Sequence, residues 1–191
     1  YSSPGYGSLR AFYISELDIE SAIKKLKPTG SVGPDNIHPL FLISCCGFLV
    51  KPLVALFNDS LRHGTFPLFW KSAYVTPIFK SGDASDVRNY RPISIIGVIA
   101  KVYDSIIADK LYCLVVNKIC CQQHGFVQGK SVVSNLLIYS DFIAEALDRS
   151  LQVDSLYTDF AKAFDSVSHM LLVDKLRGFG VDDHFIRWVY S

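Results

Sequence analysis

The sequence lacks a large net charge of either sign and lacks the cysteine spacing of a metal-binding or disulfide-rich domain. Its 191 residues include 19 Lys and Arg and 18 Asp and Glu, so the formal net charge is +1. The five cysteines form two adjacent pairs and one single residue, namely Cys45, Cys46, Cys113, Cys120 and Cys121. An odd count without a C-x-x-C spacing argues against a disulfide scaffold and a zinc ribbon. We therefore expect buried free thiols in a reducing compartment.

Long apolar runs, a secretion signal, a P-loop and a Ser/His/Asp arrangement are missing as well. The most apolar stretch, residues 93–108, contains Lys101 and Asp104, so we expect no membrane span. The first ten residues, YSSPGYGSLR, are polar and do not resemble a signal peptide. The sequence has no initiator Met and ends at Ser191, inside a segment with helical periodicity. We therefore expect the chain to be a fragment of a longer protein.

The charged residues are distributed unevenly along the chain. Residues 1–140 carry 14 Lys and Arg and 9 Asp and Glu, a net charge of +5. Residues 141–191 carry 5 basic and 9 acidic residues, a net charge of −4. A basic half joined to an acidic half fits a polyanion-binding surface beside a cation-binding site. A chance scatter of solvated charges is the alternative.

Helical and extended periodicities alternate along the chain, which indicates an α+β fold. Ser15 and Asp18 resemble a capping box at the start of a first helix, which Pro28 and Gly30 end. Gly64 is expected to end a second helix. Turns and irregular segments are expected over 31–38, 81–88 and 117–130. We expect helices over about 16–27, 39–62, 95–116, 131–147, 169–177 and from 182 onward, and strands over 73–79, 90–94 and 153–160.

Residues 156–167, LYTDFAKAFDSV, carry the strongest chemical signal. Asp159 lies at the end of an apolar predicted strand, where an acid is costly unless a divalent cation compensates it. Phosphoryl transfer with two metal ions needs carboxylates held on a rigid sheet beside an open cleft. Asp159 is therefore a candidate metal ligand, with a simple turn former as the alternative. Asp165 is interpreted as a helix cap or a surface charge.

A second candidate is the predicted hairpin over residues 71–91. It carries four cations, Lys71, Lys80, Arg88 and Arg91, against two acids, Asp83 and Asp86. Lys80 and Arg91 could hold a triphosphate, because Arg offers a bidentate fork and Lys a point charge. An ordinary hairpin with solvated charges is the alternative. Pro92 indicates an edge strand or a strand end.

A third candidate is the segment 123–131, QHGFVQGKS. Its two glycines allow a close approach of the backbone, Phe126 offers a stacking face, and Lys130 can meet a phosphate. A loop that leads into a helix cap is the alternative. His124 is interpreted as a structural residue rather than a ligand.

Four blocks of the sequence, the second of them made of two segments, resemble motifs of reverse transcriptases from non-LTR (LINE-type) retrotransposons and follow one another in the same order. Residues 31–35 (SVGPD) resemble an N-terminal motif that this class shares with group II intron enzymes. Residues 77–83 (PIFKSGD) and 89–94 (NYRPIS) resemble the fingers motifs, and 123–131 resemble the next block. Residues 159–167 (DFAKAFDSV) resemble the first palm motif. Together the phrases span nearly the whole chain.

The resemblance implies a role for each matching residue. Asp159 is similar to the catalytic, metal-binding aspartate, and the main-chain carbonyl of Phe160 would add a ligand. Lys80 and Arg91 resemble the ligands of the dNTP triphosphate. Phe164 resembles the bulky residue that excludes a 2′-OH from the incoming sugar. The block that lines the nucleotide and template pocket corresponds to Gln123 on the nucleotide side and to Gly125, Phe126 and Lys130 on the template side.

The fold implied by the resemblance is a right-hand polymerase, with N-terminal helical elements over about 1–66, fingers over 67–150 and the start of a palm over 151–191. The implied reaction is RNA-directed DNA synthesis, with an RNA template, a DNA primer and dNTPs, and with two Mg²⁺ or Mn²⁺ ions in the complete enzyme. The parent protein is expected to carry an endonuclease and a thumb or C-terminal region. It is expected in the cytoplasm and nucleus, as part of a retrotransposon ribonucleoprotein.

One departure from the family pattern limits what this chain can do. The second palm motif, an aromatic residue, a spacer and two aspartates, does not occur before Ser191. One carboxylate cannot hold two metal ions, so we expect the fragment itself to be inactive. Because a palm sheet that is cut open exposes a strand edge and apolar surface, we also expect the fragment to be poorly soluble or partly molten. Two alternatives stay open: another reverse transcriptase class, such as the group II intron type, and a non-catalytic nucleic-acid-binding remnant.

Overall fold

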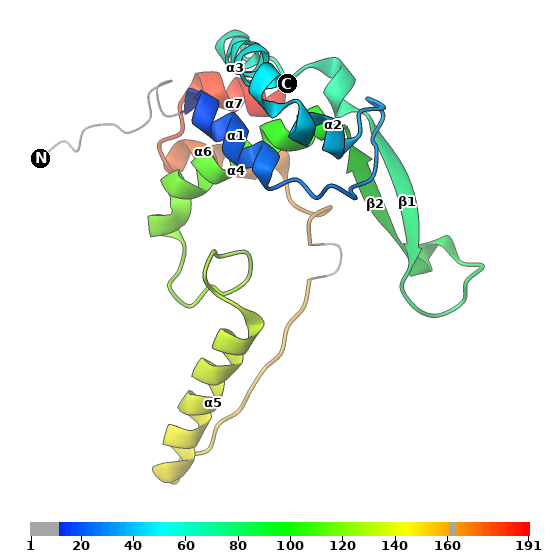
Figure 1. Ribbon diagram of the computed structural model, residues 1–191. Helices are drawn as coiled ribbons and strands as arrows, with labels where there is room; N and C mark the ends of the chain where they lie inside the picture. Colours follow the sequence, from blue (N-terminus) through cyan, green and yellow to red (C-terminus); the bar gives the residue numbers. More distant parts are fainter. Residues whose placement is uncertain (1–11, 161–162) are drawn as a thin grey trace, which may run out of the picture. The chain divides into compact units, whose positions relative to one another are not determined.

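The computed structural model describes residues 12–160 and 163–191, which form two compact units. The first unit extends to Tyr112 and also includes Lys175–Ser191, and the second unit is Cys113–Asp174. The α-helices are α1 (Glu16–Lys24), α2 (Pro39–Ser44), α3 (Cys46–His63), α4 (Val98–Val115), α5 (Val132–Asp148), α6 (His169–Gly178) and α7 (Asp183–Tyr190). Strands β1 (Ala73–Phe79) and β2 (Tyr90–Ile96) form a hairpin, and short 3-10 turns are η2 (Leu68–Lys71), η3 (Val87–Asn89) and η4 (Val116–Lys118). This mixture confirms the α+β class (Figure 1).

Local capping signals in the sequence correctly predict several helix ends. The Ser15 hydroxyl accepts a hydrogen bond from Asp18 N at 3.3 Å, and the Asp18 carboxylate accepts one from Ser15 N at 2.8 Å, which confirms the capping box. Ser131 caps α5 in the same way, with Ser134 as its partner. Gly64 ends α3 with a φ of 63°, a left-handed conformation that glycine adopts without steric cost.

Two predicted helix boundaries are wrong. The helix expected over 39–62 is divided in two, because the backbone of Cys45 (φ −101°, ψ 13°) ends α2 and then begins α3. The helix expected from residue 95 begins only at Val98, because residues 95 and 96 belong to β2 and pair with β1. The cysteines also differ from expectation: Cys45 and Cys46 are half-exposed and the other three are exposed, so none of the five free thiols is buried.

The hairpin is a two-stranded antiparallel sheet in which both strands are edges. Its register sets Ala73 opposite Ile96 and Phe79 opposite Tyr90. Pro77 lies opposite Pro92, at a position of the ladder where the two residues exchange no backbone hydrogen bonds. Neither proline therefore removes a donor that the sheet needs, which agrees with the expected edge position of Pro92.

The core of the first unit is a cluster of aromatic side chains from α3, α4, α7 and the segment before the hairpin. Phe57 stacks on Tyr103 with ring centroids 4.3 Å apart, and Trp188 meets Tyr103 edge-on at 5.2 Å. The Tyr103 hydroxyl donates to the Phe57 carbonyl at 3.0 Å. Burial raises the pKa of the Tyr103 phenol, so this donor stays protonated at neutral pH. Trp70 and Phe66 complete the cluster.

The second unit has little core of its own. Among its described residues, Ala146 is the one buried hydrophobic side chain. The strand predicted over 153–160 is wrong, because residues 151–160 form no strand ladder and carry exposed side chains such as Leu156 and Tyr157. Ser155 and Tyr157 contact Tyr139 of α5 through their side chains. Apolar residues adopt a stable strand only when a neighbouring strand satisfies their backbone groups.

Helices in the described residues are all too short or too polar to cross a membrane.

We expect Phe57→Ala to lower the free energy of unfolding by about 3–5 kcal/mol, because it opens a cavity in the aromatic cluster. Phe48→Ala on the same helix removes a side chain that is 88% exposed, and it should change the free energy by less than about 0.5 kcal/mol. Urea unfolding followed by the fluorescence of Trp70 and Trp188, both in the cluster, measures the difference. Equal effects of the two substitutions would contradict this assignment of the core.

Candidate functional site

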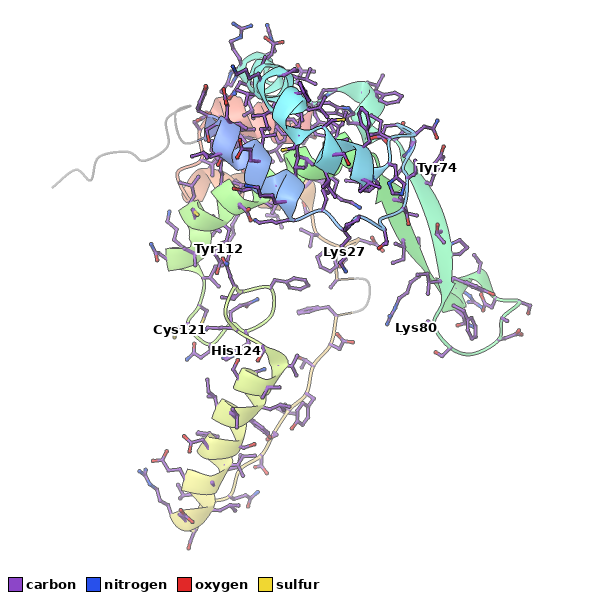
Figure 2. All side chains as sticks on the ribbon, in the orientation of Figure 1. Lys27, Tyr74, Lys80, Tyr112, Cys121 and His124 are labelled. Atoms are coloured by element: carbon purple, nitrogen blue, oxygen red, sulfur yellow. The ribbon has the colours of Figure 1, made fainter. Side chains whose placement is uncertain are left out.

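Lys80 and Arg91 lie on one face of the exposed hairpin. Arg91 pairs with Ile78, and Lys80 N donates to the Asn89 carbonyl at 2.8 Å, so Lys80 continues the same register. Side chains alternate between the two faces of a strand, which places Lys80 and Arg91 on the same side as diagonal neighbours. Figure 2 labels Tyr74 near the base of β1 and Lys80 near the tip of the hairpin. The two predicted triphosphate ligands are therefore brought together.

Both cations are free to bind an external anion. Within the described part of the chain, neither the Lys80 nor the Arg91 side chain has a hydrogen-bond or ion-pair partner, and both are exposed. Arg88 differs, because its Nη2 lies 2.7 Å from Asp86 Oδ2 and its Nε lies 3.0 Å from both carboxylate oxygens. Lys80 and Arg91 thus remain as an uncompensated pair at one end of the hairpin.

The acids of the hairpin loop are occupied by local contacts. Asp83 accepts hydrogen bonds from the Ser85 backbone N–H and hydroxyl, and these bonds lower the pKa of Asp83. The Arg88 guanidinium lowers the pKa of Asp86, to which it also donates. Both acids therefore stay ionised and are held by loop residues rather than by Lys80 or Arg91.

The base of the hairpin contains residues that sequence reasoning missed. Residues 31–38 were expected to form a turn, and Gly33 and Asp35 do lie in one. Gly33 also contacts the backbone of Ile96 and Gly97, and an oxygen of Asp35 lies near the Ile99 N–H at 3.5 Å. The SVGPD motif could have identified these residues, because its glycine, Gly33, contacts the end of β2 and its acid, Asp35, contacts the start of α4.

The segment 123–131 of the second unit is a structured loop. Gln123 Nε2 donates to the Gly125 carbonyl at 3.1 Å. Phe126 has a φ of 59°, unusual for a residue with a side chain, and is 90% exposed. Its ring meets the ring of Phe164 edge-on at 5.9 Å. Phe126 and Phe164 were assigned separately to the template and nucleotide sides, and the second unit brings them into contact.

Lys130 and His124 have partners within this unit. Lys130 Nζ donates to the Cys121 carbonyl. A phosphate would therefore have to compete with that contact. His124 Nδ1 lies 2.9 Å from the Ser134 hydroxyl, next to the cap of α5, which agrees with the structural role expected for His124 (Figure 2).

Asp159 and Asp165 are both exposed. Asp159 follows the unpaired segment 151–158, so the expectation that it ends a buried strand is wrong, and no burial cost demands a cation there. Asp165 lies in the turn over 163–166 and is exposed, which agrees with its interpretation as a surface charge. Phe160, whose carbonyl was the other expected ligand, is 81% exposed.

The described residues do not fit a two-metal centre. Within residues 12–160 and 163–191, no group of three or more His, Cys, Asp or Glu side chains lies close enough to hold a metal ion. Asp159 offers one carboxylate and Phe160 one carbonyl, whereas two ions need several shared carboxylates.

The chain matches the family model described as reverse transcriptase (RNA-dependent DNA polymerase) over residues 78–191. It is 30% identical, over 84% of its length, to the probable RNA-directed DNA polymerase from transposon BS of Drosophila melanogaster. It is 28% identical, over 92% of its length, to the RNA-directed DNA polymerase from mobile element jockey of the same species. It is also 28% identical, over 89% of its length, to the retrovirus-related Pol polyprotein from type-1 retrotransposable element R2 of Popillia japonica.

These matches cover 18%, 19% and 23% of the relatives' own lengths, so the chain spans less than a quarter of each. The family match covers more than half of this chain and includes the hairpin cations, the loop 123–131 and Asp159. The resemblance drawn from the four sequence phrases is thereby confirmed, and the chain belongs to the reverse transcriptase (RNA-dependent DNA polymerase) family, with relatives among the non-LTR retrotransposons.

Proposed function

We propose that the protein carrying this chain is the RNA-directed DNA polymerase of a non-LTR retrotransposon, and that it copies RNA into cDNA. The observation that carries the proposal is the pair of exposed, unpartnered cations on one face of the hairpin, Lys80 and Arg91. The reaction is inferred from membership of the family, and the nucleotide is proposed to bind at Lys80 and Arg91.

The hairpin cations suit a triphosphate in both geometry and charge. The Arg91 guanidinium can donate two parallel hydrogen bonds to phosphate oxygens, while Lys80 adds a mobile point charge. Negative charge develops on the leaving pyrophosphate when a primer 3′-OH attacks the α-phosphate. The two cations would interact more strongly with the transition state, where this charge develops, than with the bound substrate, and this difference would accelerate the step.

The second unit would supply the surface that meets the sugar and the template. Phe164 is the residue proposed to lie beneath the incoming sugar, where a bulky ring leaves no room for a 2′-OH. Its edge-on contact with Phe126 restricts its orientation. Phe126, exposed at the tip of the loop, offers a stacking face for a template base, and Gln123 and Gly125 shape the same loop.

Asp159 is proposed as one metal-binding carboxylate of the complete enzyme, with Phe160 adding its carbonyl. The bound ions, two Mg²⁺ or Mn²⁺, supply activation of the primer hydroxyl and stabilisation of the leaving group. Because the described residues alone do not fit such a centre, further carboxylates must come from other sequence of the parent protein. The 191-residue chain is accordingly proposed to be inactive by itself.

The remaining assignments follow from the same proposal. Residues 1–66, of which 1–11 lie outside the described residues, would be N-terminal helical elements. Residues 67–150 would be the fingers and 151–191 the start of the palm of a right-hand polymerase. The partners would be an RNA template, a DNA primer and dNTPs, with template binding that weakens as salt is added. Fusion to endonuclease and thumb regions, and a place in a cytoplasmic and nuclear ribonucleoprotein, complete the proposal.

We expect the complete reading frame that carries this chain to extend a primer on an RNA template in the presence of Mg²⁺. Asp159→Asn should reduce cDNA synthesis at least about 100-fold, the scale of losing one essential electrostatic contact. Asp141→Asn on α5, another exposed acid of the second unit, is the matched control and should leave the rate unchanged. Gel analysis of labelled primer measures all three.

An inert wild-type protein that binds RNA as well as its Asp159→Asn form would overturn the polymerase proposal in favour of a non-catalytic nucleic-acid-binding remnant. Equal loss in the Asp159 and Asp141 variants would remove the special role of Asp159.

We expect Lys80→Ala and Arg91→Ala each to raise the KM for dNTP about 10-fold or more, because a hydrogen bond to a charged group contributes about 1.5–3 kcal/mol. Arg91→Lys keeps the charge but loses the fork, so its KM should lie between wild type and Arg91→Ala. Arg88→Ala is the control from the same hairpin, since Asp86 already holds that guanidinium. Steady-state kinetics with varied dNTP gives the values, and a KM that rises equally in the Arg88 variant would refute the assignment.

A further inference from the structure

The hairpin and α4 meet at a single glycine. Ile96 is the last residue of β2, Val98 is the first of α4, and Gly97 lies between them. The Gly97 carbonyl accepts the first helical hydrogen bond, from Lys101 N at 3.0 Å. Gly97 therefore occupies the position where a helix usually has a capping side chain, and it has none.

Asp35 supplies the missing cap from a distant part of the chain. Its Oδ2 lies 3.5 Å from Ile99 N, and its Oδ1 accepts a hydrogen bond from Ile37 N at 3.3 Å. A carboxylate at this end of a helix is favourable, because the unsatisfied N–H groups carry partial positive charge. A Cβ added at Gly97 would lie 2.6 Å from Asp35 Oδ2, so the absence of a side chain at Gly97 is what admits the carboxylate.

Gly33 brings the same loop against the end of the strand. Gly33 is buried, and a Cβ added there would lie 2.4 Å from the Ile96 carbonyl oxygen and 2.6 Å from Gly97 N. Both neighbours are backbone atoms, which cannot move aside as a flexible side chain can. The turn is closed by Asn36 N, which donates to the Gly33 carbonyl at 3.0 Å.

The rest of the hairpin has little to hold it in place. Residues 74–80 and 91–94 are exposed, so burial does not anchor the strands along their length. Figure 1 shows β1 and β2 extending away from the helices of the first unit. The orientation of the strands is therefore determined mainly at their base, where β2 passes into α4.

We propose that Gly33, Asp35 and Gly97 form a clasp that holds the hairpin at a defined angle to α4. Asp35 is then a positioning residue for Lys80 and Arg91. The clasp stands on the contacts described above, and its consequence for nucleotide binding rests on the proposed function. A loosened clasp leaves a smaller fraction of molecules with both cations in the binding position, which weakens apparent nucleotide affinity in proportion.

The first test is hydrogen exchange, followed by mass spectrometry, in the complete reading frame that carries this chain. Asp35→Ala should accelerate exchange in peptides covering residues 97–101 about 10-fold, the scale of losing a helix cap. Asp182→Ala is the matched control, because Asp182 caps α7 of the same unit by accepting from Phe185 N at 2.8 Å. It should leave exchange at 97–101 unchanged. Unaltered exchange at 97–101 in the Asp35 variant would overturn the clasp, whatever the enzyme does.

A second pair of variants tests the contact itself. Gly97→Ala should accelerate exchange at 97–101 as Asp35→Ala does, because the new Cβ displaces the carboxylate. In the double variant, Asp35→Ala makes room for that Cβ, so the two effects should not add. Fully additive effects would show that the two residues act independently and would contradict the clasp.

The consequence for the nucleotide is tested by separating KM from kcat. Asp35→Ala should raise the KM for dNTP about 5-fold or more with kcat little changed. A variant that merely unfolds in part loses active molecules, which lowers kcat and leaves KM at the wild-type value. Faster exchange together with an unchanged KM would overturn the positioning role. A wild-type protein that neither makes cDNA nor binds a dNTP defeats the proposed function, and the exchange result alone then decides the clasp.

Discussion

The stacked contact between Phe57 and Tyr103 is the interaction on which the first unit depends. It joins α3 to α4 through two fully buried rings, and the Tyr103 hydroxyl adds a hydrogen bond to the Phe57 carbonyl. Trp188 brings α7 onto the same rings, and its indole N–H donates to Ser60 at 3.0 Å. Because α4 continues directly from β2, this core also provides the fixed body from which the exposed hairpin extends.

Sequence reasoning located the elements whose signals are local. Capping residues such as Ser15 and Ser131 and the αL glycine at 64 act through neighbours within five residues, so the local pattern was sufficient to predict them. The break at Cys45 has no such signal, since neither glycine nor proline marks it. The strand expected over 153–160 is wrong for a different reason. Apolar residues favour an extended conformation, but a strand forms only when a neighbouring strand pairs with it.

The candidate site likewise combines features that local sequence signals predict with features that depend on contacts between distant residues. The sequence predicted a hairpin that carries Lys80 and Arg91 as a pair of phosphate ligands. Their shared face follows from the register of the two strands, which the structure supplies. The contact between Phe126 and Phe164 joins positions 38 residues apart on a loop and a turn, which no periodicity encodes. The cap that Asp35 provides to α4 joins residues 64 positions apart, and no local sequence signal links an acid in one turn to the N-terminus of a later helix.

The two sets of residues that the proposed reaction needs, the triphosphate-binding cations and the metal-binding carboxylates, are thus not equally complete within this chain. The cation side needs only a hairpin with a defined base, and residues of the first unit provide both the base and the charges. The carboxylate side needs Asp159 held rigidly beside other acids, whereas Asp159 is exposed and follows a segment that belongs to no strand. Within the described residues, Asp159 thus has neither a strand ladder to fix it nor other acids close enough to share a metal ion. A neighbouring strand that paired with this segment would bury its apolar side chains, fix the Asp159 carboxylate and supply the rigid edge on which further acids could be placed.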